Sequence, residues 1–354
     1  MPQARGSIKA RFPSTLPPVA TLVLDPTRPD PAAITRAATA ILAGELVAFP
    51  TETVYGLGAA ALDPRAVAKI YAAKGRPSYN PLIVHVLGVE QARALVRDWP
   101  PLADALAQRF WPGPLTLVLP KQPIVPDLVT AGLDTVAVRA PAHPIARALL
   151  EAGGVPIAAP SANRFQAISP TTAAHVARSL GPEAALILDG GPTSVGIEST
   201  VVGLGGVGEP PTLLRVGGLP AAQIEAITGP LARPEPSAQG AARSSPGLDD
   251  RHYAPRGILT IVARSDLADA LADLDRGAGP IGSITIGAAP LGVDHAIELP
   301  SDPSDYARLL YASLHTLDEL GCARILVEAV PSNPAWAAIA DRLSRAATQA
   351  RGGF

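Results

Sequence analysis

Apolar residues recur along the chain with two alternating periods. Over residues 34–45 and 102–111 they return every three or four positions, which predicts helices that bury one face. Short apolar runs at 81–87, 116–120 and 135–138 predict buried strands. The segment 46–58 predicts a buried strand that leaves into a loop. The alternation of the two patterns predicts an α/β protein with a mixed sheet.

The same alternation resumes after a stretch rich in proline, alanine and glycine. Residues 19–219 are expected to form the first domain and residues 257–347 a second, smaller Rossmann-like domain of three layers. Residues 220–256 are expected to be a linker. The first 18 residues carry basic side chains without an apolar core after them, so a flexible tail is expected instead of a secretory signal.

Charge and cysteine content narrow the function classes. A formal net charge of −2 argues against a general nucleic-acid-binding surface, so an anion site must come from a local cluster. The single cysteine, Cys322, excludes an intrachain disulfide and a cysteine zinc cage, and it suits the reducing cytoplasm. No apolar run is long enough to span a bilayer.

Cations gather in the segment KIYAAKGRPSYNPLIVHV. Lys69, Lys74 and Arg76 flank a turn stiffened by glycine and proline, and such a loop suits a polyphosphate. A solvated charged loop is the alternative. His85 interrupts the next apolar run, where a histidine is more often a satisfied core residue than part of a site.

Polar side chains also follow several predicted strands. Arg139 ends one strand, and a buried charge there needs either an internal ion pair or a ligand carboxylate. Thr53, Ser161 and Arg215 follow other strands. Open α/β sheets bind ligands at the ends of their strands, so these weak signals together predict one site.

Eight motifs occur in an order that resembles the threonylcarbamoyl-AMP synthase family. They are FPTETVYGLG, KGRPSYNPLIVHV, WPGPLTLVL, VAVRAP, PSANRFQAISPT, DGGPTSVGIESTVV, RVG and PGLDDRHYAP. The chain resembles the long form of the family from about residue 20 to residue 346. That form has a YrdC-type catalytic domain with a twisted mixed sheet, a linker and a Sua-type C-terminal domain.

The resemblance implies that L-threonine, bicarbonate or CO₂, and ATP yield threonylcarbamoyl-AMP and pyrophosphate. The product would pass to the machinery that makes threonylcarbamoyladenosine beside the tRNA anticodon. Magnesium is expected with the ATP. The catalytic signature falls on Lys74 and Arg76. The ATP contacts fall on Arg76, Asn80, Thr135, Ser161, Asn163, Ser169, Arg215 and Tyr253, and the threonine contacts on Thr53, His85, Arg139, Ala159 and Ser199.

Two other classes stay open at this point. An RNA-binding module is one, although the net charge and the 4% aromatic content weaken it. A carbamoyltransferase that uses carbamoyl phosphate is the other, although one cysteine does not suit the extra metal-binding domains of such proteins. The end of the linker, where Arg251, His252 and Tyr253 lie between prolines, is expected to fold over the site as a lid.

Overall fold

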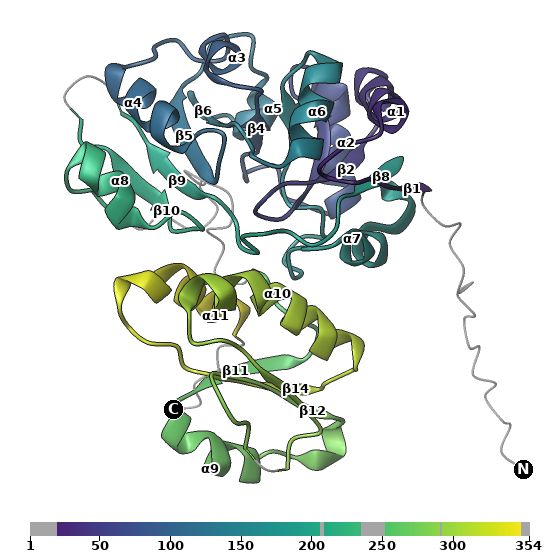
Figure 1. Cartoon of the computed structure of the whole chain (residues 1–354), viewed down its shortest axis with the longest axis vertical. Helices are drawn as coiled ribbons and strands as arrows, with labels where there is room; N and C mark the ends of the chain where they lie inside the picture. The colour runs from purple at the N-terminus through teal and green to yellow at the C-terminus, as the bar shows by residue number, and fades with distance from the viewer. Residues whose placement is uncertain (1–19, 206–208, 235–251, 291, 348–354) are drawn as a thin grey trace, which may run out of the picture.

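The computed structural model describes residues 20–205, 209–234, 252–290 and 292–347. Figure 1 shows two units, each built on its own sheet, with the second packed against one side of the first. The predicted tail over 1–18 and most of the predicted linker, residues 235–251, lie outside the described residues. Within the described part, no helix has the length and apolar character needed to cross a membrane.

The first unit contains a mixed sheet, as predicted. The order of its described strands is β1 (Ala20–Val23), β8 (Leu186–Asp189), β2 (Val47–Pro50), β3 (Tyr55–Ala60), β7 (Ile157–Ala158), β4 (Ile83–His85), β6 (Thr135–Arg139), β5 (Leu115–Pro120), β9 (Thr200–Gly203) and β10 (Thr212–Arg215).

The segment 46–58 differs from its prediction as a strand that runs into a loop. It forms two antiparallel strands, β2 and β3. The Thr51 hydroxyl closes the turn between them by donating to the carbonyl of Val54 at 2.7 Å and accepting from the Val54 N–H at 3.2 Å. Such hydrogen bonds between a side chain and its own turn stabilise the reversal of the chain, which then continues as β3. The apolar content of the segment did not predict this second strand.

Helices cover both faces of the first sheet unequally. The larger apolar core lies under α2 (Pro64–Lys74), α3 (Val89–Arg93), α4 (Pro101–Phe110), α5 (Asp127–Thr130), α7 (Ala173–Leu180) and α8 (Ala221–Thr228). On the other face, α1 (Pro31–Leu42) and α6 (Pro144–Gly153) cover only the part near β8, β2 and β7. A separate small apolar cluster on this sheet contains Ile83, Val118 and Ala137, and its Ile83 lines the site described below.

The spacing of apolar residues explains why α1 forms where it was expected. Ile34, Ala37, Ala38 and Ile41 recur at intervals of three and four, and all four are buried against α6. The Asp30 side chain caps the first turn by accepting from the Ala32 N–H at 3.1 Å. Each buried isoleucine contributes about 1.5–3 kcal/mol of transfer free energy, so the stripe holds the helix on the sheet.

The linker does not begin at residue 220, where it was predicted. Residues 221–228 form α8, whose Ile224 is fully buried in the larger core of the first unit and whose axis lies beside α4. Proline and glycine bound this stretch on both sides, which in the sequence alone is typical of a linker. Its one deeply buried side chain leaves almost no periodic signal.

The second unit is a three-layer α/β structure, as predicted. Its described sheet is parallel in the order β11 (Ile258–Val262), β14 (Arg324–Glu328), β12 (Ile281–Thr285) and β13 (His295–Glu298). One face carries α9 (Leu267–Ala272) and the other α10 (Pro303–Glu319) and α11 (Ala337–Ala346). β13 was not predicted, because this edge strand alternates between exposed and half-buried positions.

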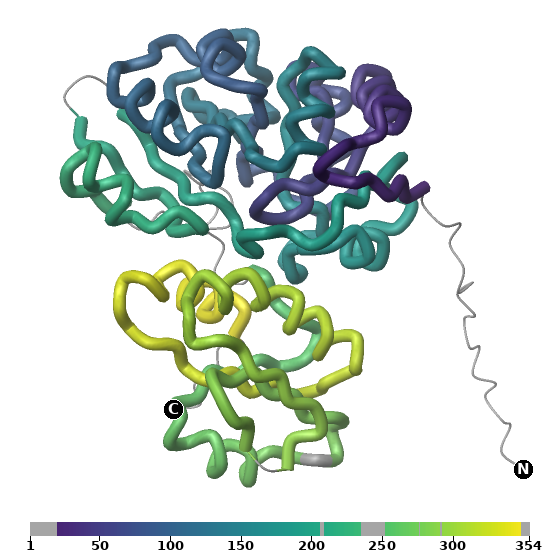
Figure 2. The backbone as a smooth tube through the Cα atoms, in the orientation of Figure 1, coloured from purple at the N-terminus to yellow at the C-terminus, as the bar shows by residue number. Residues whose placement is uncertain are grey.

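The two units share an apolar core. Val54, Ile168 and Ile197 of the first unit pack with residues of α10 in the second, and Figure 2 shows α10 and α11 on the side that faces the first unit. Gly196 makes this close approach possible, since a Cβ there would lie 2.4 Å from the Cα of Arg308. Its φ of +83° also favours glycine. The units therefore meet through packed surfaces and not only through the connecting segment.

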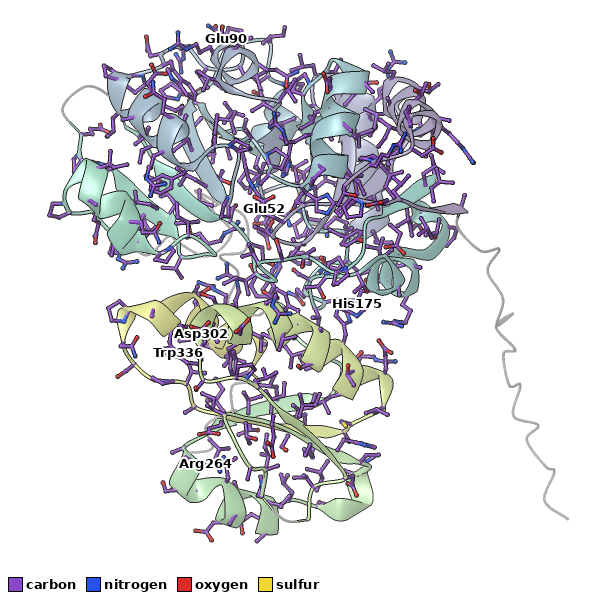
Figure 3. The ribbon with its side chains drawn as sticks, viewed as in Figure 1. Glu52, Glu90, His175, Arg264, Asp302 and Trp336 are labelled. Carbon is purple, nitrogen blue, oxygen red and sulfur yellow. The ribbon has the colours of Figure 1, made fainter. Side chains whose placement is uncertain are left out.

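A pair of histidines lies at one end of this interface. His175 of α7 and His315 of α10 stack with ring centroids 3.8 Å apart, where α7 meets α10 (Figure 3). Arg178 and Glu319 form an ion pair beside them. Burial, followed by the charges of His315 and Arg178, lowers the pKa of His175 to about 3. Burial also lowers the pKa of His315 to about 4. Both rings are therefore neutral near pH 7.

We expect this pair to make the fold less stable in acid. An unfolded histidine titrates near pH 6.5, so below that pH the unfolded chain takes up protons that the folded pair refuses. The stability that the neutral pair contributes is therefore fully present above about pH 6.5, and it decreases as the pH falls toward 4. His315→Phe keeps a ring in the stack without the titration. Between pH 7 and pH 5, the free energy of unfolding, measured by urea titration, should fall by about 1–2 kcal/mol less in the variant than in the native protein. Equal losses in the two proteins would contradict this role.

Candidate active site

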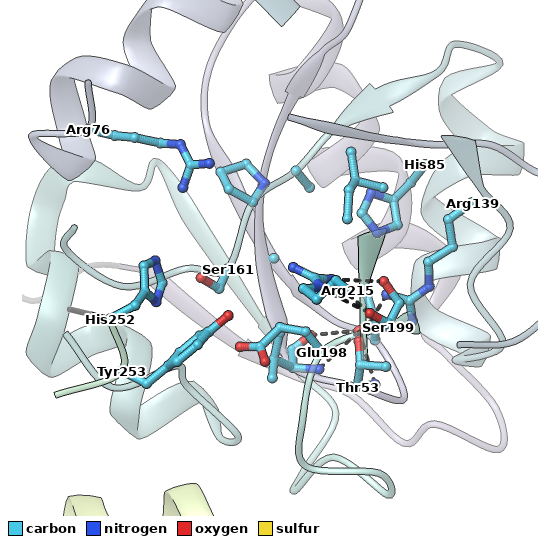
Figure 4. Close-up of a pocket in the computed structure, with 16 residues that line it drawn as sticks. Thr53, Arg76, His85, Arg139, Ser161, Glu198, Ser199, Arg215, His252 and Tyr253 are labelled. Carbon is cyan, nitrogen blue, oxygen red and sulfur yellow. Dashed lines mark hydrogen bonds between the residues drawn. The ribbon is translucent and has the colours of Figure 1, made fainter. Parts of the chain in front are cut away.

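One cavity lies on the uncovered part of the first sheet and is closed by the segment that leads into β11. The empty space within it, open solvent at the mouth included, is about 540 Å³. Figure 4 shows charged and polar side chains from both sides pointing into it. The lining residues are Thr51, Thr53, Val54, Gly56, Arg76, Ile83, His85, Arg139, Ala159, Pro160, Ser161, Glu198, Ser199, Arg215, His252 and Tyr253.

Strand register places His85 beside Arg139. β4 and β6 are parallel, with Ile83 opposite Ala137 and His85 opposite Arg139. Alternate residues of a strand share a face, so His85 and Arg139 stand on the cavity side while Val84 enters the core below. Burial, and then the Arg139 charge, lower the pKa of His85 to about 3. The ring is neutral, and its buried Nδ1 has no hydrogen-bond partner among the described residues.

Arg139 is held from three sides. Its guanidinium lies 2.8 Å from a carboxylate oxygen of Glu52, and it donates to the Thr53 hydroxyl at 3.0 Å and to the Gly113 carbonyl at 3.2 Å. The internal ion pair that the sequence left open is therefore present. It does not exclude a ligand, because the same arginine also lines the cavity.

Arg215 is a second fixed cation in the lining of the cavity. It ends β10 and donates through Nε and Nη2 to the carbonyl of Ser199, at 3.1 and 2.9 Å, and through Nη2 to the Ser199 hydroxyl at 3.1 Å. That hydroxyl also lies 2.8 Å from the hydroxyl of Thr116 on β5. These contacts fix the direction of the guanidinium before any ligand arrives.

The predicted cation loop contains three different environments. Lys69 forms an exposed ion pair with Glu45 at 2.9 Å, so at this residue the alternative of a solvated charge is correct. Arg76 lines the cavity and is buried. Lys74 is the last residue of α2 and is 3% exposed, so it is not a loop cation as expected. Burial and the nearby Arg76 charge lower its pKa well below the usual value.

Lys74 binds backbone and does not reach the cavity. Its ammonium donates to the carbonyl of Ser161 at 2.6 Å and to the carbonyl of Asn163. The Asn163 side chain in turn donates to the carbonyl of Ala167 at 2.8 Å. Lys74 therefore holds the loop that presents Ser161 to the cavity.

His252 and Tyr253 close the cavity from the side of the second unit. The Ala254 N–H donates to the carbonyl of Gln166 at 2.9 Å, and the His252 N–H donates to the carbonyl of Arg345 on α11 at 3.1 Å. The segment is thus tied to both units. Tyr253 has a φ of +63°, which is rare for a bulky residue and costs about 1–3 kcal/mol, so its surroundings hold it in place.

Comparisons with known proteins identify the family of this chain. A family model described as “Telomere recombination” matches residues 39–217, and one described as “Threonylcarbamoyl-AMP synthase, C-terminal domain” matches residues 219–348. The threonylcarbamoyl-AMP synthase of Pyrococcus abyssi is 45% identical over 312 residues, which cover 86% of this chain and 90% of that protein. This chain belongs to the threonylcarbamoyl-AMP synthase family.

Two further matches extend over most of the synthase chain. The threonylcarbamoyl-AMP synthase of Bacillus subtilis is 44% identical over 323 residues, which are 89% of this chain and 92% of that one. The crystal structure of P. abyssi Sua5 complexed with L-threonine superposes with a TM-score of 0.86 at 42% identity, covering 93% of this chain and 97% of that one. The resemblance and the fold predicted from the motifs are confirmed.

The cavity brings together most of the residues that the motifs of the synthase family suggested. Those that line it are Thr53, Arg76, His85, Arg139, Ala159, Ser161, Ser199, Arg215 and Tyr253. The lining does not include Lys74, Asn80, Thr135, Asn163 or Ser169. Thr135 opens β6 on the same face as Arg139, but four residues of extended chain separate the two by roughly 13 Å.

Two carboxylates were not predicted as functional. Glu52 pairs with Arg139, and Glu198 lines the cavity and is 6% exposed. Both lie inside quoted motifs, and each is an acidic residue in a stretch that is otherwise buried. An acidic residue within such a stretch indicates that a cation lies nearby, because a buried carboxylate needs one, and this signal could have identified Glu52 and Glu198 as part of the site.

We expect Lys74 to be required for stability, because its ammonium joins the end of α2 to the loop of Ser161. Lys74→Met removes two charge-assisted hydrogen bonds and should lower the free energy of unfolding by about 2–4 kcal/mol, as measured by urea titration. Lys69→Met is the matched control on the same helix. Its exposed ion pair contributes about 0–1 kcal/mol. Equal stability of the two variants would show that Lys74 does not hold the loop.

Proposed function

We propose that this synthase binds L-threonine and ATP side by side in the cavity and joins them through a carbamate to give threonylcarbamoyl-AMP and pyrophosphate. The observation that carries the proposal is one cavity whose lining contains the buried Arg139–His85 pair together with Arg76, Ser161 and Arg215. The match over 93% of the chain to a Sua5 structure that contains L-threonine supports it.

The threonine half of the proposed site lies over β4 and β6. Arg139 binds the amino acid carboxylate with the part of its guanidinium that faces the cavity, and the unpartnered Nδ1 of His85 orients the substrate. Thr53 and Ser199 supply hydroxyl groups in the same lining. The side chain of Ala159 is small, which leaves room for the substrate.

The nucleotide half lies between Arg76, Ser161, Arg215 and Tyr253. The two arginines face the phosphates, and the tyrosine ring offers a surface beside the nucleoside. Asn80 and Ser169 are fully buried, and Asn163 is 1% exposed, so they act by fixing the surrounding loops in this arrangement. Thr135 keeps only the role that the resemblance implies.

The proposed chemistry needs positioning and charge more than covalent catalysis. The threonine amine adds to CO₂ and loses a proton, which gives a carbamate. A carbamate oxygen then attacks the α-phosphorus in line, and the bond to pyrophosphate breaks. Arg76 and Arg215 offset the negative charge that develops on the leaving group. His252 and Tyr253 exclude water from the carbamate and from the mixed anhydride, both of which hydrolyse.

Magnesium remains part of the proposal as a companion of ATP. The carboxylate that lines the cavity, Glu198, already accepts hydrogen bonds from Ser169 and Arg342. The described lining therefore has no dedicated carboxylate set for the ion. We propose that phosphate oxygens and water hold it, and that it partly neutralises the triphosphate.

The cellular setting is proposed on chemical grounds. Threonylcarbamoyl-AMP is a labile mixed anhydride, so the product should pass directly to the enzymes that modify tRNA, in the cytoplasm. RNA binding by this chain itself would be weak at most, given its net charge of −2. The match to synthases over most of the chain favours the synthase over both an RNA-binding module and a carbamoyltransferase.

The assay that tests this function measures pyrophosphate release. We expect release from ATP only when both L-threonine and bicarbonate are present, because the carbamate is the nucleophile. Mass spectrometry of the product should show threonylcarbamoyl-AMP. Release that continues without threonine, or a product that lacks the carbamoyl group, would disprove the proposed reaction.

Arg139 provides a test of the threonine half. Arg139→Ala should raise the KM for threonine at least about thirtyfold and the KM for ATP far less, because a buried carboxylate contact contributes about 2 kcal/mol or more. Arg147→Ala is the control, since Arg147 donates to the Leu87 carbonyl at 3.2 Å and does not line the cavity. A larger loss for ATP than for threonine would reverse the assignment of the two halves.

A further inference from the structure

Glu198 is an ionised carboxylate in the wall of the proposed nucleotide site. One of its oxygens accepts from the Ser169 hydroxyl at 2.7 Å, and the other accepts from Arg342 Nε at 2.7 Å and from the Tyr311 hydroxyl at 3.1 Å. Burial would raise its pKa, but Arg342 and then Arg215 outweigh burial and lower it. Two of its partners, Arg342 and Tyr311, belong to the second unit.

Arg342 comes from α11 and is 1% exposed. Besides Glu198, it donates to the carbonyl of Val216 in the first unit at 3.0 Å, and Asp341 is its neighbour on the other side. Its guanidinium carbon also lies 5.1 Å from the centre of the Tyr253 ring. One side chain of the second unit therefore contacts both a wall of the cavity and the residue that closes it.

The position of this contact has an electrostatic consequence. ATP carries several negative charges, and a carboxylate in the wall of its site repels it unless a cation neutralises the carboxylate. Arg342 neutralises Glu198 from behind, on the side away from the cavity lining. Arg76 and Arg215 also line the cavity, and once Arg342 compensates Glu198, the net charge of the lining favours the phosphates.

The Tyr253 ring depends on the same arginine. The ring contacts both the Arg342 guanidinium and the ring of Tyr311, whose centroid is 5.6 Å away at an angle of 29°. Because Tyr253 has an unfavourable backbone conformation, side-chain contacts of this kind are needed to hold it. Loss of Arg342 would remove one of these contacts.

We propose that Arg342 is a positioning residue for ATP, through which the second domain neutralises Glu198 and holds Tyr253 against the nucleotide site. The inference rests on the proposed function, but it assigns a role to a domain that supplies none of the phosphate-facing cations. In this view the second domain is part of the ATP site, and its docking sets the affinity for nucleotide.

A purely structural ion pair is the competing explanation. Buried ion pairs are often replaceable by apolar residues without loss of stability, so stability alone cannot decide between the two roles. The roles differ in what happens to ATP. A structural pair changes the unfolding free energy, whereas a positioning residue changes the KM for ATP in protein that is still folded.

The test uses four full-length variants: Arg342→Met, Glu198→Gln, the double variant, and Arg264→Met as control. Arg264 also forms an ion pair with a buried glutamate, Glu328, at 3.0 Å, but this pair lies within the second unit and does not line the cavity. For each variant, KM for ATP, KM for threonine and kcat are measured. Equilibrium binding of a fluorescent ATP analogue and a urea unfolding curve accompany the kinetics.

We expect Arg342→Met to raise the KM for ATP and the dissociation constant of the analogue at least tenfold, with less than a threefold change in the KM for threonine. The double variant should recover most of the analogue affinity, because the uncompensated carboxylate is gone, and any remaining loss measures the support of Tyr253. Arg264→Met should leave all three kinetic constants unchanged.

Three outcomes would overturn the inference. Unchanged analogue binding by folded Arg342→Met would show that the ion pair is only structural. A double variant as weak as Arg342→Met would show that Arg342 does not act through Glu198. If Arg342→Met does not fold, Glu198→Gln decides: it leaves the Arg342 charge uncompensated beside the site and should bind the analogue more tightly than the native protein, so equal or weaker binding would exclude the inference. Failure of the native protein to bind the analogue would instead contradict the proposed function.

Discussion

The site depends on how a buried excess of positive charge is held in place. Lys74, Arg76, Arg139, Arg215 and Arg342 are all less than a tenth exposed around one cavity, and Glu52 and Glu198 each neutralise one of these arginines. An isolated buried cation is costly, so each is directed at carbonyls, hydroxyls or a carboxylate. The net positive charge that remains around the cavity suits a polyanionic ligand. The hydrogen bonds from these cations to loop carbonyls also fix the conformation of the surrounding loops.

This constraint also explains the use of two domains. The open face of the first sheet is apolar at its floor and charged at its rim, and it is covered from outside by the segment around Tyr253 and by α10 and α11. Tyr253 has a strained conformation, and the segment that contains it is bonded to both domains. Domain docking, closure of the cavity and the charge balance at Glu198 are therefore parts of one arrangement.

Local signals in the sequence predicted the outline of the protein well. Helical spacing predicted α1 and α4, and the apolar runs predicted the buried strands β4, β5 and β6. These elements follow from short-range periodicity and from burial on a defined face. The site residues came from motif order and the family resemblance, since each was weak when taken alone. The sequence did not reveal β13 or the strand β3, because an exposed edge and a side-chain turn leave little periodic trace.

Only the tertiary structure decided what each charged residue does. Lys69 and Lys74 lie on one helix five residues apart, yet one faces solvent and the other is buried against the loop of Ser161. Glu198 and Arg342 are separated by 144 positions, so no local pattern relates them. The strength of a charge interaction depends on distance and burial, and both are set by how the two sheets pack. The sequence alone determined which elements form and which residue types meet at the strand ends, whereas the packing determined which charges are paired and which face the substrate.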